Sequence, residues 1–241
     1  MVAYIKFILI SFVVLYSATG FAKAVRISGA AIFKSNSVYR GVLTWSRPSF
    51  FIGPGIIFYE KIHVRGPSFV YTHFKRRDRY KLDVKLSTFN DRKPLFDLSS
   101  DEENFRNSRS STFDFGVDTA YKFGFRNLFV VGAELSYEFK EYNAFYMYPY
   151  IKLPVAPFVS LKLGVSVGAK ETNKYLYGET AKSGMGFYSA ALNGFMPLFK
   201  GALICGLEYT SVQQEENRES YLVGGKPDNL NLALRYVVKF N

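Results

Sequence analysis

Every second residue of the segment 230–240 is a large apolar side chain, and this alternation restricts the possible folds more than any other feature. The apolar positions are Leu230, Leu232, Leu234, Tyr236, Val238 and Phe240, and the positions between them are Asn231, Ala233, Arg235, Val237 and Lys239. Successive side chains of an extended strand point to opposite faces, so the segment predicts a two-faced β-strand. Its apolar face must be covered either by another protein layer or by lipid.

A similar alternation recurs along the chain, while helical periodicity is weak throughout. It predicts strands at residues 26–33, 39–46, 50–59, 62–74, 79–89, 112–125, 129–140, 144–152, 159–168, 185–196, 199–210 and 230–240. An even number of two-faced strands is typical of closed barrels in bacterial outer membranes. The predicted fold is therefore all-β, a closed antiparallel transmembrane β-barrel of about 12 strands, with a barrel of about 10 strands as the alternative.

The predicted connections favour a barrel because their lengths divide by end. The short connections are 47–49, 75–79, 126–127, 153–157 and 197–198, whereas the long, polar ones at 90–110, 170–184 and 211–228 fall at the opposite end. Outer-membrane barrels have short periplasmic turns and longer extracellular loops. The same register predicts two aromatic belts, with Trp45, Tyr80, Phe123, Phe125 and Tyr236 near the periplasmic rim and Tyr39, Tyr137, Phe139 and Tyr209 near the outer rim.

Residues 1–24 have the pattern of a secretory signal peptide. Lys6 precedes the run 7–16, which is apolar except for Ser11, and Ala22-Lys23-Ala24 fits the small-x-small rule for cleavage after Ala24. A retained helical anchor is the rival interpretation, but the run is shorter than the ~20 residues that a membrane span needs. Cleavage leaves residues 25–241 as one exported domain, expected in the outer membrane of a Gram-negative bacterium. The domain stays basic, because loss of Lys6 and Lys23 lowers the formal charge of +11 by only two.

Most charged side chains of the predicted strands fall on the face opposite the apolar one, and we expect them to line the lumen. A Lys or Arg that faced lipid at the midplane would cost ~2–4 kcal/mol, which favours this confinement. The predicted lining comprises Arg40, His63, Arg65, Lys81, Asp83, Lys85, Asp114, Asp118, Lys122, Glu134, Glu138, Lys162, Glu208, Arg235 and Lys239. This lining fits a narrow, somewhat cation-lined channel. A lumen closed by salt bridges is the simpler interpretation, because only larger barrels reliably leave an open path.

Side chains suited to catalysis or metal binding are scarce. The single Cys205 excludes an intramolecular disulfide, and two histidines leave little material for a histidine-based metal site. The predicted register puts His63 and His73 on one inward face, without a serine motif beside them and without a distinctive carboxylate pair. No phosphate-binding glycine loop occurs. We therefore predict no catalytic, cofactor-binding or metal-binding residues and no enzyme, with a lipid-modifying barrel enzyme as the weakest alternative.

The densest basic cluster comprises Lys75, Arg76, Arg77 and Arg79, in a predicted periplasmic turn. An exported barrel meets no nucleic acid, so we expect the cluster to contact anionic head groups, cell-wall polymer or an acidic protein surface. A charged turn that merely keeps a strand end in water is the alternative.

Several short motifs follow one another along the chain. They are Tyr39-Arg40-Gly41, Arg47-Pro48-Ser49-Phe50, the run from Asn90-Asp91 through Leu95-Phe96-Asp97-Leu98 to Phe113, and Tyr175-Leu176-Tyr177-Gly178 leading to Ser183 and Gly186-Phe187-Tyr188. With a barrel strand at the end of the chain, this order resembles the MipA/OmpV family of outer-membrane proteins, also called the MltA-interacting-protein family. The resemblance extends over nearly the whole mature chain.

The resemblance implies a non-enzymatic outer-membrane protein with a structural or scaffolding role in the cell envelope, bridging murein-synthesising and murein-cleaving enzymes. It carries over no partner-binding residues, because the matching positions belong to strands and turns. A narrow porin for small solutes is the alternative. The expected partners are outer-membrane lipid and lipopolysaccharide, the barrel-assembly machinery and periplasmic murein enzymes, with no cofactor and no nucleic acid.

The final strand should also serve as the assembly signal, through Tyr236, Val238 and Phe240. An apolar-alternating last strand that ends in an aromatic residue resembles the signal read by the barrel-assembly machinery. We predict that Phe240→Ala lowers the amount of folded protein in outer-membrane fractions, whereas deletion of Asn241 is tolerated. Equal outer-membrane levels for the two variants would refute this role of Phe240.

Overall fold

The computed structural model describes residues 25–45, 47–65, 68–73, 79–89, 96–97, 111–124, 129–219 and 226–240. The predicted signal peptide and its cleavage residues Ala22 and Ala24 lie outside this part of the chain. The described strands are β1 (Val25–Lys34), β2 (Ser37–Tyr39), β3 (Val42–Trp45), β4 (Ser49–Phe58), β5 (Ile62–Arg65), β6 (Ser68–Thr72), β7 (Tyr80–Phe89), β8 (Phe96–Asp97), β9 (Thr112–Phe123), β10 (Phe129–Glu138), β11 (Phe145–Ala156), β12 (Val159–Gly168), β13 (Gly184–Leu198), β14 (Gly201–Val212) and β15 (Asp228–Phe240), and the described helices are α2 (Lys170–Tyr177) and α3 (Glu215–Arg218).

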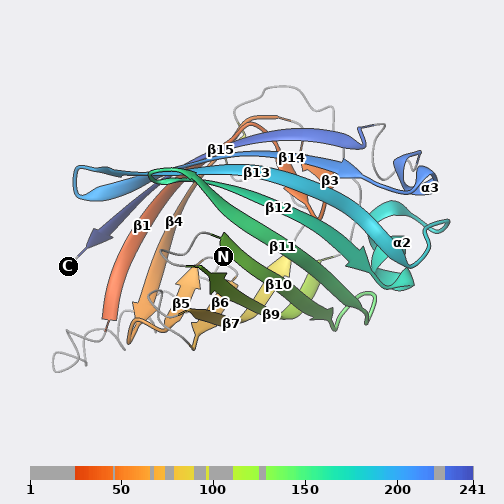
Figure 1. Ribbon diagram of the computed structural model, residues 1–241, viewed down its shortest axis with the longest axis horizontal. Coiled ribbons are helices and arrows are strands. Elements are labelled where there is room, and N and C mark those ends of the chain that lie inside the picture. The colour runs from red at the N-terminus through yellow and green to blue at the C-terminus, as the bar shows by residue number, and fades with distance from the viewer. Residues whose placement is uncertain are drawn as a thin grey trace, which may run out of the picture.

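Twelve of the described strands form one closed antiparallel ring (Figure 1). Its order is β1-β15-β14-β13-β12-β11-β10-β9-β7-β6-β5-β4, and β1 closes it by pairing with both β15 and β4. The short β8 pairs with β4 beside the ring, where Phe96 lies opposite Phe50. The predicted closed barrel of about 12 strands is confirmed. The alternative of about 10 strands is wrong.

Two predicted strands are wrong, although their errors cancel in the count. The segment predicted as a wall strand at 39–46 belongs instead to a separate two-stranded hairpin of β2 and β3. The segment predicted as one strand at 62–74 is two strands, β5 and β6, in which Arg65 pairs with Ser68 across Gly66-Pro67. Glycine followed by proline, as at 66–67, is a strong turn signal in a sequence.

The division of 62–74 into two strands separates the two histidines. His63 pairs with Val70, which pairs with Lys85, and paired residues share one face of a sheet. Lys85 forms ion pairs inside the barrel, so His63 faces inward. His73 follows Thr72, which shares the inner face with Asp83, and it therefore points the other way, exposed beside Tyr71. The prediction that both histidines face inward is wrong for His73.

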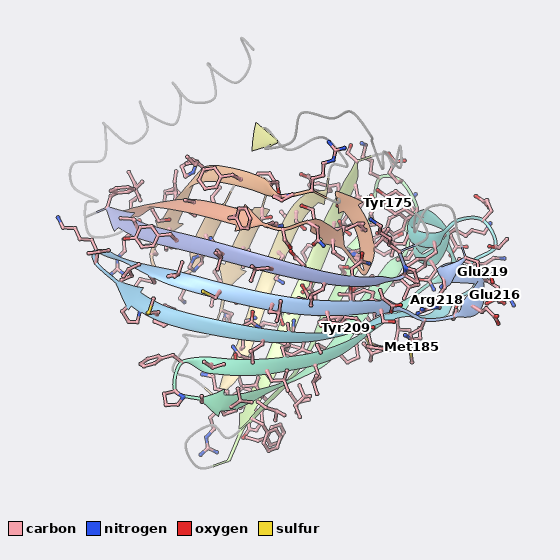
Figure 2. All side chains as sticks on the ribbon, turned by 90° about the horizontal axis from the view of Figure 1, so that it is seen from above. Tyr175, Met185, Tyr209, Glu216, Arg218 and Glu219 are labelled. Atoms are coloured by element: carbon pink, nitrogen blue, oxygen red, sulfur yellow. The ribbon has the colours of Figure 1, made fainter. Side chains whose placement is uncertain are left out.

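The two ends of the barrel differ. At one end, which we call the turn end, lie the short connections 59–61, 157–158 and 199–200, together with Val25 and Phe240. At the opposite end, the loop end, lie the connections that carry the β2–β3 hairpin, α2 and α3 (Figure 1). Tyr175, Glu216, Arg218 and Glu219 gather at the loop end (Figure 2). The predicted connection 47–49 belongs to the loop end, so β4 runs opposite to the predicted direction.

No helix among the described residues is both long enough and apolar enough to cross a membrane.

The outer face of the barrel is apolar and carries aromatic clusters near both ends. Near the turn end, Tyr121 contacts Tyr80 and Phe123, at ring-centroid separations of 4.8 and 4.5 Å. Near the loop end, Tyr137 contacts Phe139 and Phe145, at 5.0 and 4.7 Å. Aromatic girdles at both interfaces are characteristic of membrane barrels.

Two aromatic residues lie outside the belts that the sequence predicts for them. Tyr39 and Trp45 were expected in the belts, but both belong to the β2–β3 hairpin and therefore to no wall strand. Phe125 lies outside the described residues.

The inner face combines small residues with tyrosines. Gly132 on β10 lies opposite Tyr150 on β11, which in turn lies opposite Gly164 on β12. A Cβ at Gly132 would lie 2.5 Å from the Tyr150 ring and 2.8 Å from the Ala120 Cβ. The missing side chain therefore makes room for a tyrosine ring to lie flat along the wall.

We predict that Gly132→Ala destabilises the barrel by about 1–3 kcal/mol, the usual cost of overpacking a site in which the neighbours must shift. Gly53→Ala is the matched control, because a Cβ at Gly53 meets no atom within 4 Å. Urea unfolding of the refolded protein in lipid vesicles measures both. Equal unfolding midpoints for the two variants would contradict this account of Gly132.

Candidate functional site

The β2–β3 hairpin lies inside the barrel at the loop end, against β9, β10 and β13. Its turn consists of Arg40 and Gly41, with φ angles of 47° and 83°. Positive φ at both central residues is typical of the tightest hairpin turns. A Cβ at Gly41 would lie 2.5 Å from the Phe187 ring of β13, so only glycine fits against this wall strand. We call residues 37–45 the plug hairpin.

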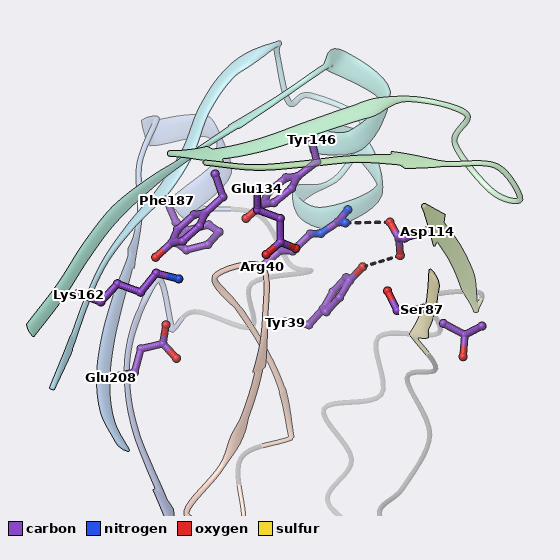
Figure 3. A pocket seen from close by; sticks show the side chains of 11 residues that line it. Tyr39, Arg40, Ser87, Asp114, Glu134, Tyr146, Lys162, Phe187 and Glu208 are labelled. Atoms are coloured by element: carbon purple, nitrogen blue, oxygen red, sulfur yellow. Dashed lines mark hydrogen bonds and ion pairs between the residues drawn. The ribbon is translucent and has the colours of Figure 1, made fainter. Parts of the chain in front are cut away.

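Arg40 anchors the plug hairpin to the opposite wall (Figure 3). Its guanidinium donates hydrogen bonds to Asp114 Oδ1 at 2.8 Å, to Ser136 Oγ at 2.9 Å and to the Tyr142 hydroxyl. It also lies over the ring of Tyr146, 4.1 Å from the centroid. The side chains of Arg40 and Asp114 are only 10% and 6% exposed. Such a pair is strongly coupled, because either charge would be costly to leave alone in this environment.

An apolar cluster seals the plug hairpin on its other side. Val42 packs with Leu176 and Tyr177 of α2, and the cluster is completed by Ala181 and Val212. The Tyr177 hydroxyl donates a hydrogen bond to the Arg40 carbonyl oxygen at 3.3 Å. The Asn229 side chain donates to the Gly41 carbonyl oxygen at 3.4 Å. The hairpin therefore contacts several wall strands and α2 at the loop end.

Glu138, one of the predicted lumen charges, supports this arrangement without facing the cavity. Its carboxylate is fully buried and accepts hydrogen bonds from the backbone N–H groups of Phe113, Lys140, Glu141 and Tyr142. Hydrogen bonds from backbone N–H groups to a carboxylate are among the stronger ones in proteins. Glu138 thereby fixes the connection 139–144 and positions Tyr142 against Arg40.

The tyrosines around Arg40 remain neutral at physiological pH. Burial raises the pKa of Tyr39 to about 12, and burial likewise raises the pKa of Tyr142 above its usual value. Charging either hydroxyl would require desolvating an anion. The Tyr39 and Tyr142 hydroxyls therefore add no charge to the ion pair of Arg40 and Asp114.

A cavity of about 380 Å³ lies against the plug hairpin, inside the lumen. Its lining is polar and aromatic, comprising Tyr39, Arg40, Ser87, Thr88, Asp114, Glu134, Tyr146, Tyr148, Lys162, Phe187 and Glu208 (Figure 3). A second cavity of about 250 Å³ shares Lys162 and Glu208 with the first and is otherwise lined by Ala191, Asn193, Gly206, Asn231 and Ala233. The lumen thus contains polar space that the side chains do not fill.

Charges on one wall of the lumen neutralise one another. Lys81 pairs with Asp118 and, at 3.2 Å, with Asp83, while Lys85 lies 3.0 Å from Glu134 and 3.7 Å from Asp118. These residues belong to β7, β9 and β10. These ion pairs form one connected network on this side of the lumen.

The remaining predicted lining residues are placed by strand register. Arg65 pairs with Ser68 and Lys122 with Val130, while Arg235 pairs with Ile204 and Lys239 with Ser28. Each of these positions lies on the inner face. Arg40 also lies in the lumen, but it reaches it from the plug hairpin and not from the wall.

Arg79 of the predicted basic turn and the predicted assembly signal lie at the turn end. Arg79 is exposed, and Lys75, Arg76 and Arg77 lie outside the described residues. Tyr236 donates a hydrogen bond to the Leu198 carbonyl oxygen at 3.2 Å, Val238 pairs with Gly29, and a Cβ at Gly29 would lie 3.2 Å from the Phe240 ring. These residues contribute to the seam where the last strand meets the first.

Within the described part of the chain, no group of three or more His, Cys, Asp or Glu side chains is placed to hold a metal ion.

Sequence reasoning did not single out the tyrosines of the site. Tyr146, Tyr148 and Tyr150 occupy successive inward positions of β11, and Tyr142 lies in the connection before it. Their spacing of two residues was a signal for one shared face. Their role as partners of cations was not visible, because Arg40 and Lys162 come from distant segments.

Comparison with known proteins gives little further information. No protein-family model matches the sequence, and no curated protein matches it. A solved structure of an outer membrane channel from Pseudomonas putida F1 is similar to this chain with a TM-score of 0.37 and 11% sequence identity, over 90% of this chain and 96% of that chain.

We predict that Arg40→Ala lowers the free energy of opening the plug hairpin by about 3–5 kcal/mol, because it leaves Asp114 buried without its partner. Addition of Asp114→Asn should recover part of this loss by removing the uncompensated charge. Hydrogen exchange of the amides at 37–45 measures the opening.

Arg26→Ala is the matched control for Arg40→Ala. Arg26 pairs with Glu60 at 2.8 Å, but the two side chains are 52% and 60% exposed. Exposed pairs contribute about 0–1 kcal/mol. Hydrogen exchange at 37–45 that is equally slow in both variants would contradict the anchoring role of Arg40.

Proposed function

We propose that this protein is a non-enzymatic barrel of the Gram-negative outer membrane that admits small polar solutes, with the plug hairpin as its gate. In this proposal the loop end faces outward and the turn end faces the periplasm. The plug hairpin closes the outer entrance, and its displacement connects the outside with the cavities behind it.

The polar cavity directly behind the plug hairpin is the observation that carries this proposal. A barrel that serves only as an attachment surface has no need for unfilled polar space in its lumen. Here small residues such as Gly132, Ala191 and Gly206 keep the wall thin, and hydroxyl, amide and charged groups surround the space. Such a lining stabilises water and polar solutes inside a membrane barrel.

The attachment of the plug hairpin is suited to a gate. Its ion pair with the wall is made by Arg40, whose other side-chain partners come from the wall and from the connection 139–144. The hairpin also donates a longer hydrogen bond from the Tyr39 hydroxyl to Asp114, at 3.4 Å. On the N-terminal side, Ser35 and Asn36 link it to β1, and Asn36 donates a hydrogen bond to the Leu230 carbonyl oxygen at 2.8 Å. Loss of one anchor would therefore release a short segment while the wall stays intact.

We include membership of the MipA/OmpV family in the proposal, because segments from the resembling motifs meet in space. Gly41 packs against Phe187, and Tyr177 bonds to the Arg40 carbonyl. Phe96 pairs with Phe50 on β4. Motifs that are far apart in the sequence thus contribute to the plug hairpin and the neighbouring wall.

A scaffolding role in the envelope is the second candidate, and the same convergence of motifs favours it through the family resemblance. In that role the plug hairpin would be a permanent seal, and the basic turn at Arg79 would face periplasmic partners such as murein enzymes. The two candidates differ in whether release of the plug produces a path for ions.

We predict that the wild-type protein is mostly closed in planar lipid bilayers and that Arg40→Ala produces stable conducting steps. A loss of about 3 kcal/mol at the anchor shifts a closed–open equilibrium by roughly 100-fold. Single-channel recording of both proteins measures the open probability.

Arg26→Ala again serves as the control and should record like the wild type. Arg40→Ala channels that stay closed although hydrogen exchange shows the plug hairpin to be released would contradict the gated passage and favour the scaffold.

A further inference from the structure

We infer that the space between Lys162 and Glu208, which line both cavities, binds a small zwitterion. A zwitterion carries one ammonium and one carboxylate group, as amino acids and short peptides do. Lys162 would bind the carboxylate, and Glu208 together with Asn231 would bind the ammonium. This inference names the solute class and rests on the proposed passage for its biological meaning, but the binding itself does not depend on conduction.

The register places these groups side by side on neighbouring strands. Lys162 on β12 lies opposite Ala191 on β13, Ala191 lies opposite Glu208 on β14, and Glu208 lies opposite Asn231 on β15. Neighbouring strands are about 4.8 Å apart, so the backbones at Lys162 and Glu208 are separated by about 10 Å. The small side chain of Ala191 between them leaves this space open to the cavity.

Lys162 packs against two aromatic rings. Its ammonium lies 4.2 Å from the centroid of Tyr150 and 4.6 Å from that of Tyr148, both on β11. Such cation–π contacts orient an ammonium without neutralising its charge. Lys162 forms no ion pair with any described residue, so its charge remains available to the cavity.

Glu208 has no hydrogen bond or ion pair with any described residue, although it is partly buried and lines both cavities. Asn231, which lies opposite it, has a buried Oδ1 atom that accepts no hydrogen bond from the described residues. Buried acceptors are normally satisfied. Two acceptors that both lack a donor form a suitable site for the N–H groups of a ligand ammonium.

The contrast with the opposite wall shows that these charges are unusual within this lumen. There, Lys81 and Lys85 are neutralised by Asp83, Asp118 and Glu134. Lys34 on β1 also acts electrostatically on Glu208, but Lys162 and Glu208 face one space with opposite charges and form no ion pair. A zwitterion satisfies both at once, whereas a solute with one charge leaves the other without a partner.

Titration calorimetry with glycylglycine on the folded protein in detergent tests the inference. We expect Lys162→Gln and Glu208→Gln each to weaken binding by roughly tenfold or more, since each removes a charge-assisted hydrogen bond. Lys200→Gln and Glu219→Gln, which change exposed residues away from the cavities, should bind like the wild type. Heat-modifiable mobility on gels verifies that every variant is folded.

Charge reversal gives a sharper test because it predicts a change of specificity. The Lys162→Glu variant should no longer bind glycylglycine and should bind the diamine cadaverine. The Glu208→Lys variant should bind the dianion succinate. The double variant Lys162→Glu/Glu208→Lys restores one charge of each sign and should bind glycylglycine again.

The inference is overturned if the folded wild type does not bind glycylglycine, or if the folded glutamine variants bind it as tightly as the wild type. It is also overturned if charge reversal leaves the preference unchanged. Binding with the expected specificity, in a protein whose Arg40→Ala variant does not conduct, would support the site and refute the passage. Conduction by the Arg40→Ala variant, in a protein that does not bind glycylglycine, would support the passage and refute the site.

Discussion

The pairing of β1 with both β4 and β15 is the constraint on which the rest of the structure depends. Lipid offers no hydrogen-bond partner to the backbone, so a sheet inside a membrane is stable only when no strand keeps an open edge. The register joins β1 to β4 from Val25 to Lys34 and to β15 from Ile27 to Lys34. Closure separates an apolar outer face from an inner face that must be satisfied by polar groups.

The inner face meets this requirement at two places and leaves it unmet at a third. One wall pairs its charges with one another around Asp118. The loop end receives the plug hairpin, where Arg40 and Asp114 satisfy each other far from bulk water. The wall of β12–β15 keeps an unpaired lysine and an unpaired glutamate beside unfilled space. The last arrangement is costly in a closed structural barrel and useful in one that accommodates a polar solute.

Alternation predicted the wall strands well from β7 onward, because a side chain that meets lipid and one that meets the lumen differ clearly in polarity. It failed for residues 39–46, since a hairpin inside the lumen alternates in the same way. Glycine stands at the second turn position, but Arg40 holds the first, where Asn, Asp or Gly would have marked the turn. The charged lining could be read from the same pattern. The partnership of Arg40 with Asp114 could not, because it depends on which strand the plug hairpin meets.

Access of a thiol reagent to the cavity from the loop end tests the central claim most directly. The variant Glu208→Cys, in a Cys205→Ser background, places one cysteine behind the plug hairpin. Proteoliposomes in which the loop ends face outward are then treated with a membrane-impermeant thiol reagent. The account predicts slow modification while Arg40 is present and fast modification when Arg40→Ala is added. Equally fast modification in both proteins would show that the hairpin does not close the lumen.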